Sequence, residues 1–299
     1  MQQAERPTQY CSPKAFEETY VNSGRCLSDT DIRLVAEEVV GRNARKLKQL
    51  GDVDAMIGML SQRLGPDMSA WADHVDLKDR REIRDKLKRR FRPKYPRKWM
   101  DKPSTWLNTG DITRVMKQYE LSDRHFKFLG VYPRDFTSRI HNMKVCMAGE
   151  HVCDLDVDSL WKNKRYHIGI VLNTDTHDRD GSHWVACFIS INPNKPMYGA
   201  YYYDSSSHPP PQEVFEWMLH VRKKVEQSRF IVKSEEAYRH SFEIAHNHER
   251  RQFRNTECGM FAIHFLTTAK QNATTFRELC NAMGYDDDMF ALRKVLFRP

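Results

Sequence analysis

Apolar residues recur at helical spacing along the first 90 residues of the chain. One stripe follows Ser28, which can cap a helix, and comprises Ile32, Val35, Ala36, Val39 and Val40. A second stripe runs from Val53 to Leu64 and stops at Gly65-Pro66, a pair that ends helices. A third comprises Ile83, Leu87 and Phe91. The pattern therefore predicts a helical arm domain, which we place at residues 1–90.

Beyond residue 91 the pattern changes to loops rich in proline and then to short runs of β-branched and aromatic residues. The runs predicted to be strands are 166–172, 183–191, 198–204 and 230–232. Helices are expected at 214–225 after three prolines, from Cys258 onward, and at 289–297. These elements predict an α+β fold over residues 91–299, a mixed β-sheet with a buried helix that begins at Cys258.

Positive charge is concentrated where these two parts meet. The chain of 299 residues has a net charge of +8, and residues 78–98 alone hold 12 Lys or Arg against 3 Asp or Glu. Such a segment can contact nucleic acid through its phosphates, although a solvated helix face is the more common use of a charge run. We keep nucleic-acid contact through residues 78–98 as a prediction.

Long apolar runs are missing from the sequence, and the N-terminus lacks the apolar core of a signal peptide, so we expect a soluble protein without a membrane span. Seven scattered cysteines without a C-x-x-C pair fit a reducing compartment and mostly inert thiols. His240, His246 and His248 cluster without a fourth ligand at zinc spacing. Asp286–Asp288 lack a calcium-loop pattern and are expected to begin a helix. We therefore expect no metal and no cofactor.

Thiol chemistry is the best-supported activity. A thiol protease needs a thiolate, a base, a group that holds the base in one tautomer, and donors for an oxyanion. Cys258 lies where a polar loop meets an apolar helix, whose dipole favours a thiolate, although a cysteine buried for packing would fit the same segment. His183 begins the most hydrophobic strand and is the candidate base. Its rivals by position are His167, His177 and His208.

The remaining site candidates follow from neighbouring elements. Asp204 ends the next strand, so adjacent strands can put it beside His183, where it would hold the imidazole tautomer; capping of the serine turn is its alternative role. Gln252 precedes Cys258 and can donate its amide to the oxyanion. Trp184 can form the wall of a narrow substrate channel, and Gly259 leaves room for a substrate backbone.

In combination, His183-Trp184, Asp204 and Gln252-x5-Cys258-Gly259 resemble the SUMO-protease and adenovirus-protease clan of cysteine peptidases. The order His, Asp, Cys differs from the papain-like order, in which the cysteine comes first. The segment 106–112 is similar to the W-L-N-D-x-x-I motif that opens the catalytic domain of SUMO proteases, with its aspartate displaced, and this implies a substrate contact for Trp106.

The runs LNTD, HWVA and TECG, preceded by a helical arm, resemble the polyprotein-processing proteases of large cytoplasmic DNA viruses, of the African swine fever virus type. That resemblance implies cleavage of viral structural polyproteins after Gly-Gly or Gly-Xaa during virion maturation, in the host cytoplasm and the virion. Three alternatives stay open. They are an isopeptidase for SUMO or other ubiquitin-like proteins, a cysteine-dependent acetyltransferase using coenzyme A, and an inactive module that binds nucleic acid.

Overall fold

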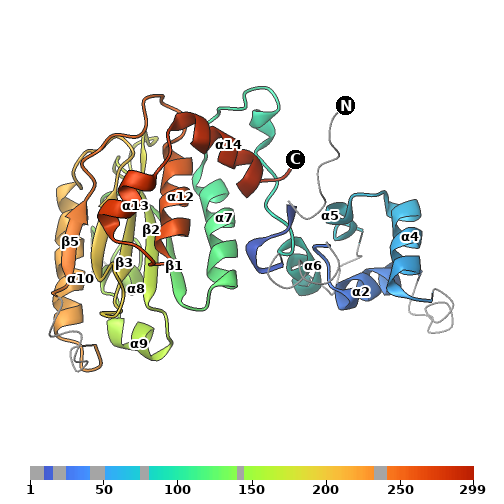
Figure 1. Cartoon of the computed structure of the whole chain (residues 1–299), viewed down its shortest axis with the longest axis horizontal. Helices are drawn as coiled ribbons and strands as arrows, with labels where there is room; N and C mark the ends of the chain where they lie inside the picture. Colours follow the sequence, from blue (N-terminus) through green and yellow to red (C-terminus); the bar gives the residue numbers. More distant parts are fainter. Residues whose placement is uncertain (1–9, 16–24, 41–50, 75–80, 140–144, 232–240) are drawn as a thin grey trace. The chain divides into compact units, whose positions relative to one another are not determined.

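The chain forms two compact units in the computed structural model, which describes residues 10–15, 25–40, 51–74, 81–139, 145–231 and 241–299. One unit contains residues 1–94 and 297–299, and the other contains residues 95–296. The sequence pattern places the boundary at residues 90–91, and the compact units separate at residues 94–95. Figure 1 shows the helices of the first unit in blue to teal and those of the second in green to red.

The first unit is helical. Its helices include α2 (Asp29–Val40), α4 (Val53–Leu64), α5 (Met68–Trp71) and α6 (Arg81–Lys88). Their apolar stripes meet in one core that contains Ile32, Val35, Leu60, Leu87 and Phe91. Asp52 caps α4 by accepting the backbone N–H of Ala55 at 2.9 Å. The predicted helices at 28–40 and 53–64 are therefore confirmed.

Four of the seven cysteines correct the expectation of separate, inert thiols. In the structure Cys11 is paired with Cys26, and Cys146 is paired with Cys153. The chain spacing of these residues carries no recognised disulfide pattern, so only the folded structure brings them together. Cys280 fits the expectation, because burial raises the pKa of its thiol to about 12.

The second unit is built on a five-stranded mixed sheet, as the sequence predicts. Its strands are β1 (Phe126–Pro133), β2 (His167–Asn173), β3 (Trp184–Ser190), β4 (Gly199–Tyr203) and β5 (Glu243–His246), in the order β1-β2-β3-β4-β5. The central strand β3 is antiparallel to both of its neighbours, β2 and β4, whereas β1 and β5 are parallel to the strands they join. The three central strands are almost fully buried, which explains their continuous apolar runs.

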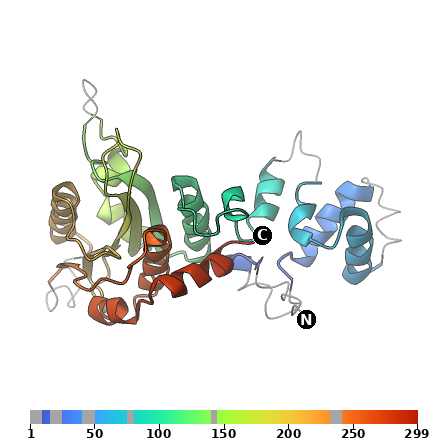
Figure 2. The ribbon, with the colours of Figure 1, turned by 90° about the horizontal axis from the view of Figure 1, so that it is seen from above.

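Helices cover both faces of this sheet (Figure 2). On one face, α10 (Gln212–Glu226) packs through Trp217, Met218 and Val221 against Ile170, Cys187 and Tyr202. On the other, α12 (Cys258–Ala269) packs on β3, and the Phe265 ring stacks on Tyr203 with ring centroids 4.8 Å apart. The buried helix that begins at Cys258 is confirmed.

Some elements differ from the sequence prediction. The helix α7 (Thr109–Ser122), the strand β1 and the strand β5 are not among the predicted elements. The predicted strand at 230–232 is wrong for its described residues, which form a turn. Val232 lies outside the described residues. The remaining helices are η2 (Arg97–Trp99), α8 (Glu150–Cys153), α9 (Val157–Lys162), α13 (Phe276–Ala282) and α14 (Asp286–Leu296).

The last helix begins as the sequence predicts. Asp286, Asp287 and Asp288 occupy the first turn of α14, and the Asp288 carboxylate accepts the backbone N–H of Tyr285 at 2.8 Å. Within the described part of the chain, no helix is both long and apolar enough for a membrane span.

Candidate active site

Two antiparallel strands bring His183 and Asp204 to one end of the sheet. Ala186 of β3 lies opposite Tyr203 of β4, so the residue before β3 and the residue after β4 must be neighbours. The His183 ring Nε2 lies 2.6 Å from Asp204 Oδ1. The sequence-predicted pairing of these side chains is therefore present in the structure.

Asp204 is completely buried, and a set of donors holds it in place. Its Oδ1 also accepts the backbone N–H of Ser206 at 2.7 Å, and its Oδ2 lies 3.1 Å from the His208 ring Nδ1. The backbone on either side of Asp204 is held by Asn247. This amide accepts the Asp204 N–H at 2.8 Å and donates to the Asp204 carbonyl at 2.7 Å.

Cys258 is the first residue of α12, and it is buried. Its thiol lies close enough to the His183 ring to raise the pKa of that imidazole. Because Asp204 occupies Nε2, the ring nitrogen that remains for the thiol is Nδ1. The three side chains thus form one line of interacting groups, with a hydrogen bond between His183 and Asp204 and with the sulfur at the positive end of a helix dipole.

The electrostatics of this line favour a charged imidazole. Burial alone would lower the pKa of His183, but hydrogen bonds and charge from Asp204 and Cys258 outweigh burial and raise that pKa to about 9. Burial likewise raises the pKa of Asp204, yet the His183 hydrogen bond and charge, with the Ser206 N–H and His208, lower it overall. An imidazolium held between a carboxylate and a sulfur is the state in which a cysteine acts as a nucleophile.

Gln252 is anchored to the residue that follows Asp204. Its side-chain Oε1 accepts the Ser205 hydroxyl at 2.6 Å, and its backbone N–H donates to the Ser205 carbonyl at 2.9 Å. Since the carbonyl end of the planar amide faces Ser205, the NH2 end points away from Ser205. A buried amide fixed in this way is a suitable oxyanion donor.

Of the three residues predicted to contact substrate, Trp184 and Gly259 pack against Leu107, whereas Trp106 is exposed. The Trp184 indole N–H donates to the Leu107 carbonyl at 2.9 Å, which fixes the ring. A Cβ added at Gly259 would lie 3.2 Å from Leu107 and 3.3 Å from Trp184, so glycine lets the first turn of α12 approach both. Trp106 is 42% exposed and leaves a large aromatic face in reach of a ligand.

An ion pair that sequence reasoning missed lies directly beside the nucleophile. Glu257 precedes Cys258 and is buried, and the Arg293 guanidinium of α14 binds it through two nitrogens at 2.8 and 3.0 Å. Arg293 also donates to the carbonyls of Pro103 at 3.1 Å and Thr105 at 2.8 Å. One side chain therefore connects the loop before Cys258 to the segment that leads to Leu107.

The rival histidines lie in other environments. The His177 ring Nδ1 lies 2.6 Å from Asp135, and that hydrogen bond raises the pKa of His177. Burial lowers the pKa of His167 to about 4, which keeps its ring neutral. His208 contacts the far oxygen of Asp204.

Metal binding has no support in the described part of the chain. There, no group of three His, Cys, Asp or Glu side chains could hold a metal ion. His246 and His248 pack with ring centroids 4.3 Å apart, whereas His240 lies outside the described residues.

The basic segment is partly neutralised within its own unit. Lys86 and Arg90 lie 3.9 and 3.3 Å from Asp31, and Lys88 lies 2.5 Å from Asp73. Residues 78–80 lie outside the described residues. Nucleic-acid contact through residues 78–98 stays a prediction.

Comparison with known proteins points to one family. The model of the Ulp1 protease family, C-terminal catalytic domain, matches residues 113–294. Among curated proteins, one from Acanthamoeba polyphaga mimivirus that carries a thiol-protease name is 26% identical over 197 residues, covering 66% of this chain and 58% of that protein. A protein of African swine fever virus (isolate Tick/South Africa/Pretoriuskop Pr4/1996), named a SUMO-1 cysteine protease, is 29% identical over 130 residues, covering 44% of this chain and 43% of the relative. The chain thus spans about half the length of these relatives.

A solved structure shares the fold along nearly the whole chain. The crystal structure of a protease of African swine fever virus matches with a TM-score of 0.62 and 19% identity. The match covers 97% of this chain and 96% of that one.

Proposed function

Because this chain belongs to the Ulp1 protease family and is a cysteine-type peptidase, we propose that it is a viral endopeptidase that cleaves structural polyproteins after Gly-Gly or Gly-Xaa during virion maturation. Its place of action would be the host cytoplasm and the virion. The observation that carries the proposal is the line of Cys258, His183 and Asp204 at one end of the sheet, in which His183 is hydrogen-bonded to Asp204 and interacts with Cys258. In this proposal the three act as nucleophile, base and orienting acid.

Acylation would start from the ion pair in which the proton of the Cys258 thiol already lies on Nδ1 of His183. The thiolate then attacks the scissile carbonyl carbon, a C–S bond forms, and the carbonyl electron pair moves to oxygen. The NH2 group of Gln252 and the backbone N–H of Cys258 would donate to that oxyanion. When the C–N bond breaks, the imidazolium gives its proton to the leaving amine.

Deacylation would use the same groups, with water in place of the amine that has left. His183 takes a proton from water, and the hydroxide attacks the thioester carbon. The C–S bond then breaks, and the sulfur leaves as the thiolate that the imidazolium stabilises. Asp204 keeps its charge throughout and stabilises the imidazolium through Nε2.

Preference for glycine follows from the crowding next to the nucleophile. Leu107 and Trp184 lie within 3.3 Å of a Cβ at Gly259, and the indole is tied to the Leu107 backbone. In a channel bounded by these rigid groups, a substrate residue without a side chain meets the least steric resistance. The exposed ring of Trp106 is proposed as a further contact of the substrate backbone.

An isopeptidase for SUMO-like proteins is the second candidate. One observation favours it, namely that a relative 29% identical over 130 residues is named a SUMO-1 cysteine protease. Such an enzyme would use the same line of side chains and the same glycine channel. The family is one of peptidases, so hydrolysis is proposed over acetyl transfer.

The deciding experiment offers a viral structural polyprotein containing Gly-Gly-Xaa sites and a SUMO precursor to the same enzyme in parallel. Wild type, Cys258→Ser and His183→Ala are compared by electrophoresis and N-terminal sequencing of the products. We expect wild type to cut the polyprotein after glycine and both variants to be inactive. Cleavage of SUMO alone would replace the proposal by the isopeptidase, and rapid cleavage after bulky residues would refute the glycine channel.

A further inference from the structure

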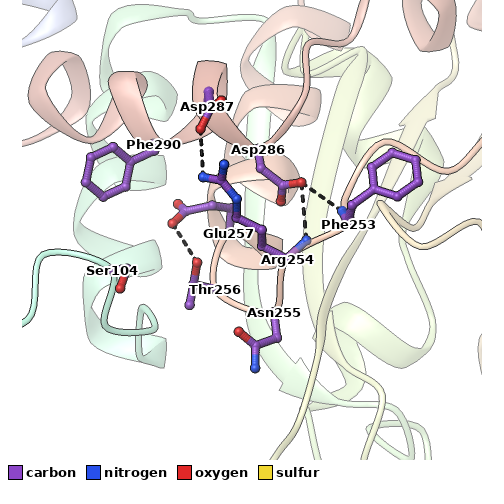
Figure 3. Close-up of a pocket in the computed structure, with 9 residues that line it drawn as sticks. All are labelled: Ser104, Phe253, Arg254, Asn255, Thr256, Glu257, Asp286, Asp287 and Phe290. Carbon is purple, nitrogen blue, oxygen red and sulfur yellow. Dashed lines mark hydrogen bonds and ion pairs between the residues drawn. The ribbon is translucent and has the colours of Figure 1, made fainter.

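A pocket of about 750 Å3 opens next to the loop that leads to Cys258. Its walls come from residues 253–257, from the first turns of α14 and from Ser104. Figure 3 shows the rings of Phe253 and Phe290 on opposite sides of the pocket, with Arg254 between them. Both rings are accessible, at 65% and 37% exposure. The mechanism above assigns no role to this pocket.

The pocket contains an acceptor whose hydrogen bonding is incomplete. Asp286 is 6% exposed, and its Oδ2 accepts the backbone N–H groups of Phe253 at 2.8 Å and Arg254 at 3.2 Å. Among the described residues, no donor reaches its buried Oδ1. A buried carboxylate oxygen without a donor is unfavourable, so a ligand that supplies one gains free energy there.

The outer part of the wall can yield to a ligand. Arg254 pairs with Asp287 at 2.7 Å, and their side chains are 65% and 83% exposed. A surface pair of this kind contributes little stability, so a ligand group can displace it at small cost. The acidic side chains that line the pocket outnumber its single arginine, which leaves the pocket with a net negative charge.

We propose that this pocket is a substrate subsite that takes a lysine side chain of the polypeptide being cleaved. The ammonium group would donate to Asp286 Oδ1, and the four-carbon stem would lie along the rings of Phe253 and Phe290. Thr256 and Glu257 line the pocket and directly precede Cys258. An extended substrate advances about 3.3 Å per residue, so a residue about two to four positions from the scissile bond can reach the pocket. The inference rests on the proposed protease function and adds a specificity to it.

The test uses internally quenched peptides built around one Gly-Gly-Xaa site. Each peptide carries either lysine or norleucine at one position, scanned over four residues on each side of the cleaved bond. Norleucine keeps the apolar stem and removes the charge. At one position we expect wild type to cleave the lysine peptide about tenfold better in kcat/KM, the discrimination that corresponds to the lower end of the range for one hydrogen bond to a charged group.

Asp286→Asn separates ligand binding from loop anchoring. The amide oxygen can still accept the Phe253 and Arg254 N–H groups, while its NH2 replaces Oδ1 and repels a lysine. We expect the lysine preference to fall to about one, with the norleucine peptide cleaved within about twofold of wild type. The matched control Asp287→Asn removes the same charge at an exposed position and is expected to keep most of the preference.

The subsite would be refuted if wild type showed no lysine preference, or if Asp286→Asn kept the full preference. It would also be refuted if Asp286→Asn lost kcat/KM equally on the lysine and norleucine peptides, because Asp286 would then only anchor the loop. Failure of the proposed protease function looks different, since wild type would then cleave none of the peptides although folded. In that event, binding of the peptides to Cys258→Ser decides the matter. Equal affinity for lysine and norleucine at every position would refute the subsite.

Discussion

Two regions of the chain concentrate charged residues, and they use them in opposite ways. In the basic segment, Lys86 and Lys88 pair with acidic partners while their own side chains stay 71% and 43% exposed. At the end of the sheet that carries the proposed active site, called the catalytic end below, Asp204, Glu257 and Arg293 are 0%, 1% and 4% exposed, and each has several hydrogen-bond partners.

The two regions differ in whether water can solvate a charge after its partner has been removed. A charge on the surface keeps its hydration when its partner is removed, so the pair contributes little. A buried charge that loses its partner cannot be solvated by water instead, so removal of the partner strongly destabilises the folded protein. We therefore expect substitutions at the catalytic end to have large effects and those at exposed pairs of the basic segment, such as Lys88 and Asp73, to have small ones.

The largest effect is expected for Asp204→Asn. The amide cannot stabilise an imidazolium, and its NH2 group facing Nε2 would favour the wrong imidazole tautomer. We expect kcat/KM to fall by about 10³ to 10⁴-fold with little change in folding, as for orienting acids in other catalytic triads. Peptide cleavage by purified variants, with circular dichroism as the folding check, measures this.

Asp135→Asn is the matched control, because Asp135 pairs with His177 at the same 2.6 Å outside the catalytic line. Its activity should equal that of wild type. A similar loss in both variants would mean that the proposed role of Asp204 is wrong.

Removing the Arg293 guanidinium is expected to have the next largest effect. Arg293→Met keeps the stem but leaves the Glu257 carboxylate buried and unpaired, which should lower the free energy of unfolding by about 3–5 kcal/mol. Urea unfolding measures this. Adding Glu257→Gln should restore part of the loss, since the uncompensated charge disappears. A loss below about 1 kcal/mol in the single variant would contradict the comparison.

The sequence was sufficient to predict the three residues that lie together at the catalytic end. His183, Asp204 and Cys258 each lie at the end of an element with a strong apolar pattern, and such ends are readable without tertiary information. Asn247 and Arg293 were not predictable in this way. Their roles depend on contacts with Asp204 and Glu257 that are 43 and 36 residues away in the chain.

The missed elements have local explanations. β1 carries a glycine and ends at a proline, and β5 is short and only partly buried, so neither shows a clear strand pattern. The start of α7 did carry a signal, a capping box between Asn108 and Asp111, followed by the stripe of Ile112, Val115 and Met116. The described residues of the strand predicted at 230–232 are Phe230 and the buried Ile231, and both belong to a turn.

The charge on His183 predicts a pH dependence of stability at the catalytic end. Its pKa is about 9 in the folded protein against 6.5 for the unfolded chain, so its contribution is fully present below pH 6.5 and is lost as the pH rises through 9. Relative to His183→Gln, wild type should lose up to about 3 kcal/mol of unfolding free energy between about pH 6.5 and about pH 9.5. Urea unfolding at both pH values tests this. A constant difference would contradict the charged state.

The smallest effect is expected for an exposed ion pair of the basic segment. Lys88 lies 2.5 Å from Asp73, with both side chains about half exposed. A double-mutant cycle of Lys88→Ala and Asp73→Ala should give a coupling energy of about 0.2–1 kcal/mol, because water screens both charges. The coupling should also shrink in about 1 M salt, where the screening length is about 3 Å. A salt-independent coupling energy above about 2 kcal/mol would mean that this exposed pair contributes as much as a buried one such as Glu257 and Arg293. The proposed difference between the two regions would then be wrong.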